Sequence, residues 1–146
     1  MRRLFLTALA IMSALGLDAQ IKSVRMQDTK AEKYGPVFFE IALTGNWDNP
    51  YLQEEAALDM LLTSPSGKEL TLPSFYRSGR SGEESTWEAR FTPQEAGTYT
   101  YRFIYKEKGQ KISESPVQVL KVKKSGKQGI LHLRDNWTLQ YDNGDI

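Results

Sequence analysis

The sequence has no cysteine and only one histidine, His132. Without cysteine the chain cannot be a disulfide-stapled module or a bacterial lipoprotein, whose lipid is attached to a cysteine. Zinc sites are built mainly from cysteine and histidine, so we expect no zinc site, and nothing in the sequence indicates a cofactor. Because His132 alternates with Leu131 and Leu133, we expect it to face solvent on a strand. A catalytic histidine would need a nucleophile and an orienting acid beside it.

The chain also lacks an excess of charge of either sign. It carries 19 basic and 18 acidic residues, which gives a net charge of +1. A protein this close to neutral has little electrostatic attraction for nucleic acid or for an anionic membrane, so we expect neither as a partner. Lysines 121, 123, 124 and 127 form the one basic cluster, which is more typical of a solvated strand end than of a binding patch.

Apolar runs long enough for a transmembrane helix, about 20 residues, are missing as well. The chain begins with basic residues (MRR), continues with apolar residues 4–17 and reaches the small residue Ala19. This pattern predicts a signal peptide over residues 1–19, with an uncleaved membrane anchor as the alternative. Its removal would leave 17 basic and 17 acidic residues. We therefore expect a secreted or periplasmic bacterial protein with no membrane attachment after cleavage.

Alternation of apolar and polar residues dominates the rest of the chain. Trp87, Ala89 and Phe91 share one strand face, and Glu88, Arg90 and Thr92 share the opposite one. After a proline- and glycine-containing corner, the aromatic residues Tyr99, Tyr101, Phe103 and Tyr105 again share one face. A period of two indicates half-buried antiparallel strands. The sequence EAGTYTY at the corner is typical of immunoglobulin-like sandwiches, in which a tyrosine hydroxyl bonds to backbone just upstream.

Similar short runs recur along the chain with turn signals between them. They lie at about residues 21–26, 37–44, 58–62, 68–72 and 116–123, with an irregularity near Val119 that suggests a bulge or a sheet edge. Residues 77–85 read as a long mobile loop. The pattern predicts an all-β, immunoglobulin-like antiparallel β-sandwich of roughly eight short strands over residues 20–128. Residues 129–146 would form two further strands that act as a linker.

No catalytic constellation stands out among the acidic residues. The neighbouring pairs Glu54/Glu55 and Glu83/Glu84 point to opposite faces wherever the chain is extended, so neither pair can flank a glycosidic bond by itself. Asp142 and Asp145 are also close in sequence, and their segment (DNGD) is typical of a simple turn. We expect all of them at the solvated surface. A structural calcium ion near Asp48 is conceivable, but no metal-ligating residue is assigned.

Aromatic residues in loops are the one signal for a ligand, because a flat ring can stack on a sugar. Trp47, Tyr51, Tyr76 and Trp137 lie in or beside predicted loops and are the candidate glycan contacts. The alternative is that these rings only cover the end of the sandwich.

Five segments taken together resemble a known bacterial domain: residues 48–51 (DNPY), 63–69 (TSPSGKE), 72–76 (LPSFY), 87–93 (WEARFTP) and 96–101 (AGTYTY). Their order and spacing are similar to those of the domain of unknown function at the N-terminus of secreted bacterial glycoside hydrolases. There it precedes an apiosidase-like or related (β/α)8 catalytic domain. The resemblance spans roughly residues 30–105 and implies an immunoglobulin-like accessory sandwich. It brings no catalytic residues.

The tail of the sequence adds to this resemblance. Residues 129–132 and 139–144 resemble the linker strands that lead into the barrel, which this chain lacks. The chain would then be a truncated product, an excised piece or a stand-alone copy of the domain.

The sequence therefore predicts a non-catalytic accessory domain of a carbohydrate-degrading enzyme, with the glycoside hydrolase catalytic domain as partner. An independent carbohydrate-binding module that contacts polysaccharide, and a cell-surface adhesion domain, are the alternatives.

Overall fold

The computed structural model describes residues 20–28 and 30–146, so the predicted signal peptide lies outside the described residues. Every regular element in this part is a β-strand, and no described helix is long and apolar enough to cross a membrane. The strands are β1 (Gln20–Met26), β2 (Ala31–Glu32), β3 (Val37–Thr44), β4 (Ala56–Thr63), β5 (Glu69–Pro73), β6 (Phe75–Ser78), β7 (Glu84–Phe91), β8 (Gly97–Glu107), β9 (Gln110–Glu114), β10 (Gln118–Lys123), β11 (Leu131–Leu133) and β12 (Leu139–Tyr141).

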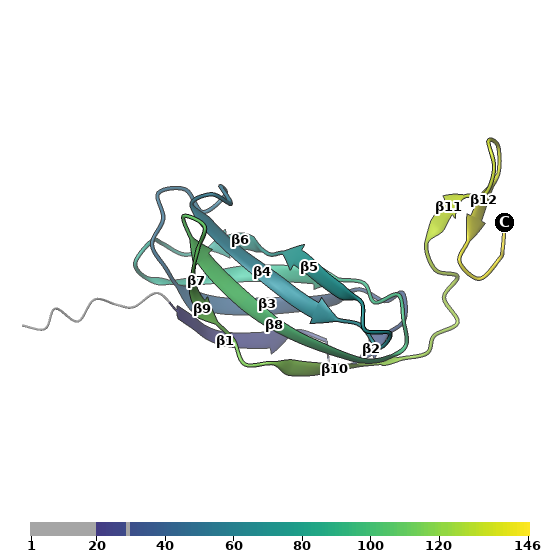
Figure 1. The fold of residues 1–146 in the computed structure, drawn as a ribbon, viewed down its shortest axis with the longest axis horizontal. Coiled ribbons are helices and arrows are strands. Elements are labelled where there is room, and N and C mark those ends of the chain that lie inside the picture. Colours follow the sequence, from purple (N-terminus) through teal and green to yellow (C-terminus); the bar gives the residue numbers. More distant parts are fainter. Residues whose placement is uncertain (1–19, 29) are drawn as a thin grey trace, which may run out of the picture.

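Two sheets pack face to face and form the predicted β-sandwich (Figure 1). The four-stranded sheet has the order β1-β3-β7-β6, and the six-stranded sheet has the order β2-β10-β8-β4-β5, with β9 also paired to β8. Alternate residues of β3, β4, β7 and β8 point into the space between the sheets and make the core. Its largest fully buried side chains are Trp87, Tyr99, Tyr105, Phe39, Phe103, Ile41, Leu43, Leu58, Met60 and Leu62.

The corner between β7 and β8 has the predicted tyrosine bond. Tyr99 is 1 % exposed, and its hydroxyl accepts a hydrogen bond from the Glu95 amide at 3.0 Å. The same hydroxyl lies 3.3 Å from the Glu95 carbonyl, to which it donates. All of the residues predicted as core in β7 and β8 are buried. The alternating pattern therefore identified the inner faces of both strands.

One edge of β8 is shared by two strands in succession. Strand β4 pairs along the other edge, whereas β9 pairs with the C-terminal half of β8 and β10 with the N-terminal half. The change falls at Ser115, whose amide donates to the Phe103 carbonyl and whose hydroxyl accepts from the Phe103 amide, both at 2.9 Å. Pro116 follows, and a residue without an amide hydrogen suits such an interruption.

For β10 the sequence predicted either a bulge or a sheet edge, and the structure favours the second. The register of β10 with β8 runs unbroken from Gln118 to Val122, so no bulge is present there. It lies near a sheet edge, because its outer neighbour β2 is only two residues long. That pair is parallel, which makes the sandwich antiparallel except at this edge.

The loop predicted over residues 77–85 is shorter than expected. Strand β6 pairs with β7 as far as Ser78 opposite Thr86, so both ends of the segment belong to the sheet. The rest of the loop is bonded to the β3–β4 connection, because the Gly82 amide donates a hydrogen bond to the Gly45 carbonyl at 2.8 Å. Apolar alternation is weak in this segment, and the sequence pattern therefore missed the pairing.

Strands β11 and β12 form a hairpin that stands apart from the two sheets (Figure 1). Its base rests on Tyr34, which has a left-handed backbone with φ of 62° and donates its amide to the Pro93 carbonyl at 2.8 Å. A side chain at Gly129 would come within 2.9 Å of the Tyr34 ring, so this close approach requires glycine. Residues 129–146 thus form a small unit beyond the sandwich.

Candidate functional site

Three of the four predicted glycan contacts come together at one end of the sandwich. Tyr51 meets the Tyr76 ring edge-to-face at 5.4 Å between centroids, and Tyr76 meets Trp47 at 6.1 Å. Both Trp47 and Tyr76 also pack against the core residue Trp87, at 5.8 and 5.6 Å. The rings form a continuous series from the core to the surface, and edge-to-face pairs of this kind stabilise one another.

The members of this series differ in their exposure to solvent. Tyr51 is 74 % exposed, Tyr76 is half-buried, and Trp47 is 8 % exposed, with its amide donating to the Ser81 hydroxyl at 2.9 Å. Tyr51, Tyr76 and Trp87 line a small cleft of about 160 Å³ beside β4 and β6. Within this group only Tyr51 presents a large ring surface on which a sugar could stack.

Trp137 lies elsewhere, in the turn of the β11–β12 hairpin. It is 95 % exposed, and its amide donates to the Asp135 carboxylate at 2.9 Å. The hairpin also exposes Leu131, Leu133 and Leu139. The structure therefore divides the predicted aromatic residues between the sandwich end and the tail. Figure 1 shows the β11–β12 hairpin, which carries Trp137, apart from the sandwich.

An open cleft of about 440 Å³, lined by both polar and apolar residues, lies at the same end of the sandwich as Trp47. Glu55 and Glu107 line it, and one Glu55 carboxylate oxygen is buried without a hydrogen-bond partner among the described residues. Glu107 accepts hydrogen bonds from the Asn46 amide at 2.6 Å and from the Tyr105 hydroxyl at 3.0 Å. Burial and this neighbouring carboxylate raise the pKa of Tyr105 far above its usual range.

Metal ligation finds no support in the part of the chain that the structure describes. Within residues 20–28 and 30–146, no three acidic or imidazole side chains lie close enough together to hold an ion. Asp48 therefore belongs to no such group. His132 is half exposed and points outward as predicted, with Nδ1 3.6 Å from the Asp142 carboxylate.

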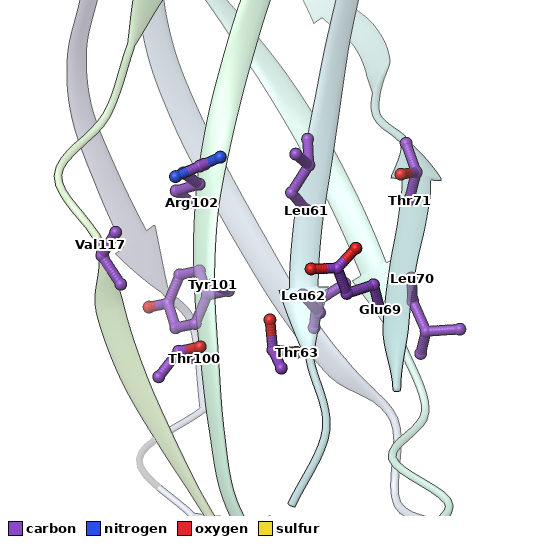
Figure 2. Close-up of a pocket in the computed structure, with 10 residues that line it drawn as sticks. All are labelled: Leu61, Leu62, Thr63, Glu69, Leu70, Thr71, Thr100, Tyr101, Arg102 and Val117. Carbon is purple, nitrogen blue, oxygen red and sulfur yellow. The ribbon is translucent and has the colours of Figure 1, made fainter. Parts of the chain in front are cut away.

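A shallow groove of about 260 Å³ runs over the outer face of the six-stranded sheet. Figure 2 shows its lining residues on β4, β5 and β8, with Val117 just ahead of β10. Leu61 and Val117 give it an apolar part, and Arg102 gives it a charge that the Glu114 carboxylate partly compensates at 3.0 Å. The groove is open and of mixed character, and it contains no group of paired carboxylates.

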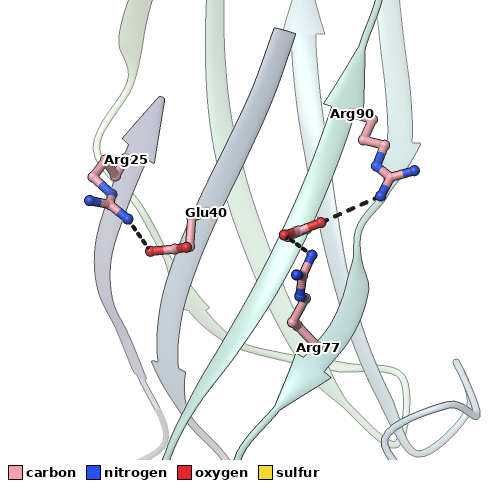
Figure 3. Close-up of polar contacts among 5 residues, drawn as sticks. Arg25, Glu40, Arg77 and Arg90 are labelled. Atoms are coloured by element: carbon pink, nitrogen blue, oxygen red, sulfur yellow. Dashed lines mark hydrogen bonds and ion pairs between the residues drawn. The ribbon is translucent and has the colours of Figure 1, made fainter. Parts of the chain in front are cut away.

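The outer face of the four-stranded sheet carries a network of ion pairs that the sequence analysis missed (Figure 3). Arg25 on β1 pairs with Glu40 on β3 at 2.6 Å, and Glu88 on β7 pairs with Arg77 at 2.5 Å. Glu40 and Glu88 are directly opposite in the register of β3 and β7. Alternation placed Glu88 and Arg90 on the outer face, but their partners come from other strands, and sequence spacing does not identify them.

These features describe an all-β domain with several shallow surfaces. The chain belongs to the family named Domain of unknown function (DUF5060), whose sequence profile matches residues 30–106. No curated protein matches the sequence.

The chain is similar to several solved structures, among them the two that follow. One is a protein of Bacteroides vulgatus named a "putative glycoside hydrolase", with a TM-score of 0.55 and 17 % identity over 81 % of this chain. The match covers 21 % of that protein, so this chain corresponds to about a fifth of its length. The other is the alkylpurine DNA glycosylase AlkC of Pseudomonas fluorescens, with a TM-score of 0.44 and 7 % identity over 73 % of this chain and 30 % of that one. The second likeness is too weak to support an inference.

Proposed function

We propose that the chain is a non-catalytic accessory domain of a secreted carbohydrate-degrading enzyme and that it packs against the catalytic domain. The sandwich would have the immunoglobulin-like character expected from the sequence, which the Tyr99 corner supports. The apiosidase-like class remains the expected type of catalytic partner. The likeness to part of the Bacteroides vulgatus protein is consistent with this role.

The observation that carries the proposal is the apolar surface of the β11–β12 hairpin. Two three-residue strands make a hairpin that is marginal in water by itself. Here it exposes Trp137 together with Leu131, Leu133 and Leu139. Contiguous exposed apolar side chains of this kind mark a contact surface. A catalytic domain that packs on the hairpin would bury these side chains and stabilise it.

We expect a glycoside hydrolase catalytic domain to be encoded next to this chain in the genome, and the test expresses that domain separately and mixes it with the chain. We expect a one-to-one complex by size exclusion with light scattering. The double variant Leu133→Ser/Trp137→Ser should bind at least about tenfold more weakly, because it removes two exposed anchors. The matched control is Val117→Ser/Val119→Ser, which removes two exposed apolar side chains from the sandwich and should bind like the wild type.

The absence of a glycan-active neighbour, or of any complex with it, would contradict the proposal. The isolated chain offers a second readout, because an uncovered apolar hairpin should promote self-association at high concentration. Sedimentation that shows only monomer would count against a docking role, and hydrolysis of a glycoside by the purified chain would overturn the non-catalytic assignment.

Carbohydrate binding by the sandwich itself is the second candidate, because Tyr51 presents its ring to solvent above the small cleft. Affinity gel electrophoresis with soluble polysaccharides tests it. We expect Tyr51→Ala to lose retardation while its exposed neighbour, changed as Leu52→Ala, keeps it. If no neutral polysaccharide retards the wild type, stacking on Tyr51 is not a function of this domain.

A further inference from the structure

Glu88 is an acidic residue that is buried on the outer face of a sheet. Its strand neighbours are Glu40 on β3 and Phe75 on β6, and the residue is 7 % exposed. A carboxylate that is removed from water must be paired, and like charges directly opposite on adjacent strands destabilise a sheet. Such a residue is tolerated only if the side chains around it neutralise it.

Two arginines supply that neutralisation. Arg77 Nη1 lies 2.5 Å from Glu88 Oε1, and Arg90 Nη2 lies 3.7 Å from Glu88 Oε2, so each oxygen faces a different guanidinium. Glu40 is paired separately with Arg25 on the other side. One carboxylate between two arginines leaves a surplus positive charge. The side chains of Arg77 and Arg90 are 57 % and 61 % exposed, so this surplus reaches solvent.

Two aromatic rings lie beside the Arg90 guanidinium. Its guanidinium carbon lies 5.0 Å from the centroid of the Phe75 ring and 5.7 Å from that of Phe38. Stacking on rings uses the faces of the guanidinium plane and leaves its N–H groups, which lie in the plane, available to an acceptor. Among the described residues the Arg90 guanidinium makes no hydrogen bond, only the long ion pair. An arginine held in this way loses little conformational entropy when an anion binds.

We propose that Arg77, Arg90 and Phe75 form a binding site for the carboxylate of a uronate-containing polysaccharide. The planar fork of arginine matches a carboxylate in two-point contact. Phe75 is 41 % exposed beside it and offers a flat apolar surface to the C–H face of a sugar ring. The choice of an acidic glycan over another anion rests on the proposed role in carbohydrate degradation. Glu88 positions the two arginines and does not touch the ligand.

Affinity gel electrophoresis tests this site with polygalacturonate, and the same polymer fully methyl-esterified serves as the uncharged control. We expect the acidic polymer to retard the chain, the ester to have little effect, and high salt to abolish retardation because the contacts are exposed. Arg90→Gln and Arg77→Gln should each weaken binding by about three- to tenfold. The matched control Arg102→Gln changes an arginine on the outer face of the other sheet and should leave binding unchanged.

Arg90→Lys separates the geometry from the charge. It keeps the positive charge but loses the planar fork and the stacking, so we expect it to weaken binding nearly as much as Arg90→Gln. Circular dichroism and the melting temperature of each variant establish that it is folded. If Arg90→Gln does not fold, Arg77→Gln and Arg90→Lys carry the test.

Three results would overturn the proposal. They are equal retardation by the esterified polymer, an equal loss in Arg102→Gln, and equally strong binding of polyglutamate, which would indicate a general anion site or a surface for acidic protein. Failure here is distinct from failure of the accessory role. The complex with a catalytic domain is measured through Leu133 and Trp137, which lie on the hairpin and not on this sheet.

Discussion

The hydrogen bonds of the Tyr99 corner give the sharpest quantitative test of how this fold is held together. The Tyr99→Phe variant removes the hydroxyl that accepts from the Glu95 amide at 3.0 Å and donates to the Glu95 carbonyl at 3.3 Å. The ring itself stays in the core, where it packs against Phe91 at 5.3 Å. The change therefore isolates the polar interaction from the apolar packing.

Its magnitude follows from what is left behind. A partly buried backbone group that loses its hydrogen-bond partner costs about 1–3 kcal/mol, and water can reach Glu95 in part. We therefore expect the free energy of unfolding to fall by about 1–2 kcal/mol. For a domain of this size that corresponds to a melting temperature roughly 4–8 °C lower. Urea unfolding followed by tryptophan fluorescence measures the free energy, with an unchanged m-value as the sign of an unchanged unfolding transition.

Tyr101→Phe is the matched control. Tyr101 is buried in the same strand and packs against Phe39 at 5.0 Å, but its hydroxyl makes no hydrogen bond with the described residues. We expect this variant to unfold within about 0.5 kcal/mol of the wild type. Equal effects of the two variants, or no effect of Tyr99→Phe, would refute the view that the corner bond contributes specifically to stability.

Three further predictions concern other parts of the molecule. Gly45→Ala should lower the free energy of unfolding by about 1–3 kcal/mol, because the added Cβ would lie 2.2 Å from the buried Tyr105 hydroxyl. The control is Gly126→Ala, where the Cβ would enter open space, and it should change the free energy little in the same urea assay. The free energy of unfolding should fall as the pH rises above about 10. Burial raises the pKa of Tyr105 in the folded chain, whereas in the unfolded chain a tyrosine hydroxyl ionises near pH 10, and phenolate absorbance measures this ionisation. The hydrogen bond from the Ile130 amide lowers the pKa of Asp142. The stabilisation that the ionised Asp142 gives the hairpin should therefore be lost as the pH falls below about 3.8, and the amide NMR signals of β11 and β12 measure this loss.

Each of these predictions has an outcome that contradicts it. For the glycines it is equal stability of the two variants. For alkaline pH it is full phenolate absorbance from every tyrosine while the chain is still folded. For acid pH the contradicting result is that Asp142→Asn leaves the amide signals of β11 and β12 unchanged at neutral pH. The hairpin would then not depend on the charge of Asp142.

The fold class could be predicted because the buried residues of a sandwich strand are every second residue, so apolar residues alternate with polar ones in the sequence. In β7 the alternation identified Trp87 and Phe91 as core, and in β8 it did the same for Tyr99 and Tyr105. The tyrosine corner could be predicted because all of its partners lie within a few residues of one another. Local patterns suffice when local spacing determines the contacts.

Periodicity failed where contacts join distant parts of the chain. It gave no reason to separate Trp47, which the core covers, from Tyr51, which solvent reaches, because both lie in a loop without a repeating pattern. It also treated residues 77–85 as a loop, since the pairing of Ser78 with Thr86 includes a register shift and little apolar alternation. Burial in such segments depends on which strands come to lie beside them.

The ion network shows the same limit for a candidate site. Sequence alternation placed Glu88 and Arg90 on the outer face of β7, which is correct. It could not show that Glu40 is opposite Glu88 or that Arg77 and Phe75 flank Glu88, because these neighbours are set by strand order and register. Charge spacing along one strand says nothing about charges on the next.

The sequence by itself therefore determined the class of fold, the core faces of its main strands, the Tyr99 corner and the resemblance to a domain of unknown function associated with glycoside hydrolases. Each of these depends on spacing along a single strand or on motifs in order. The tertiary structure alone decided which aromatic rings reach solvent, that the β11–β12 hairpin stands apart with its apolar side chains exposed, and that two arginines converge on Glu88. Those features arise from the pairing of strands that are distant in sequence, and strand pairing is set by the packing of the whole sandwich.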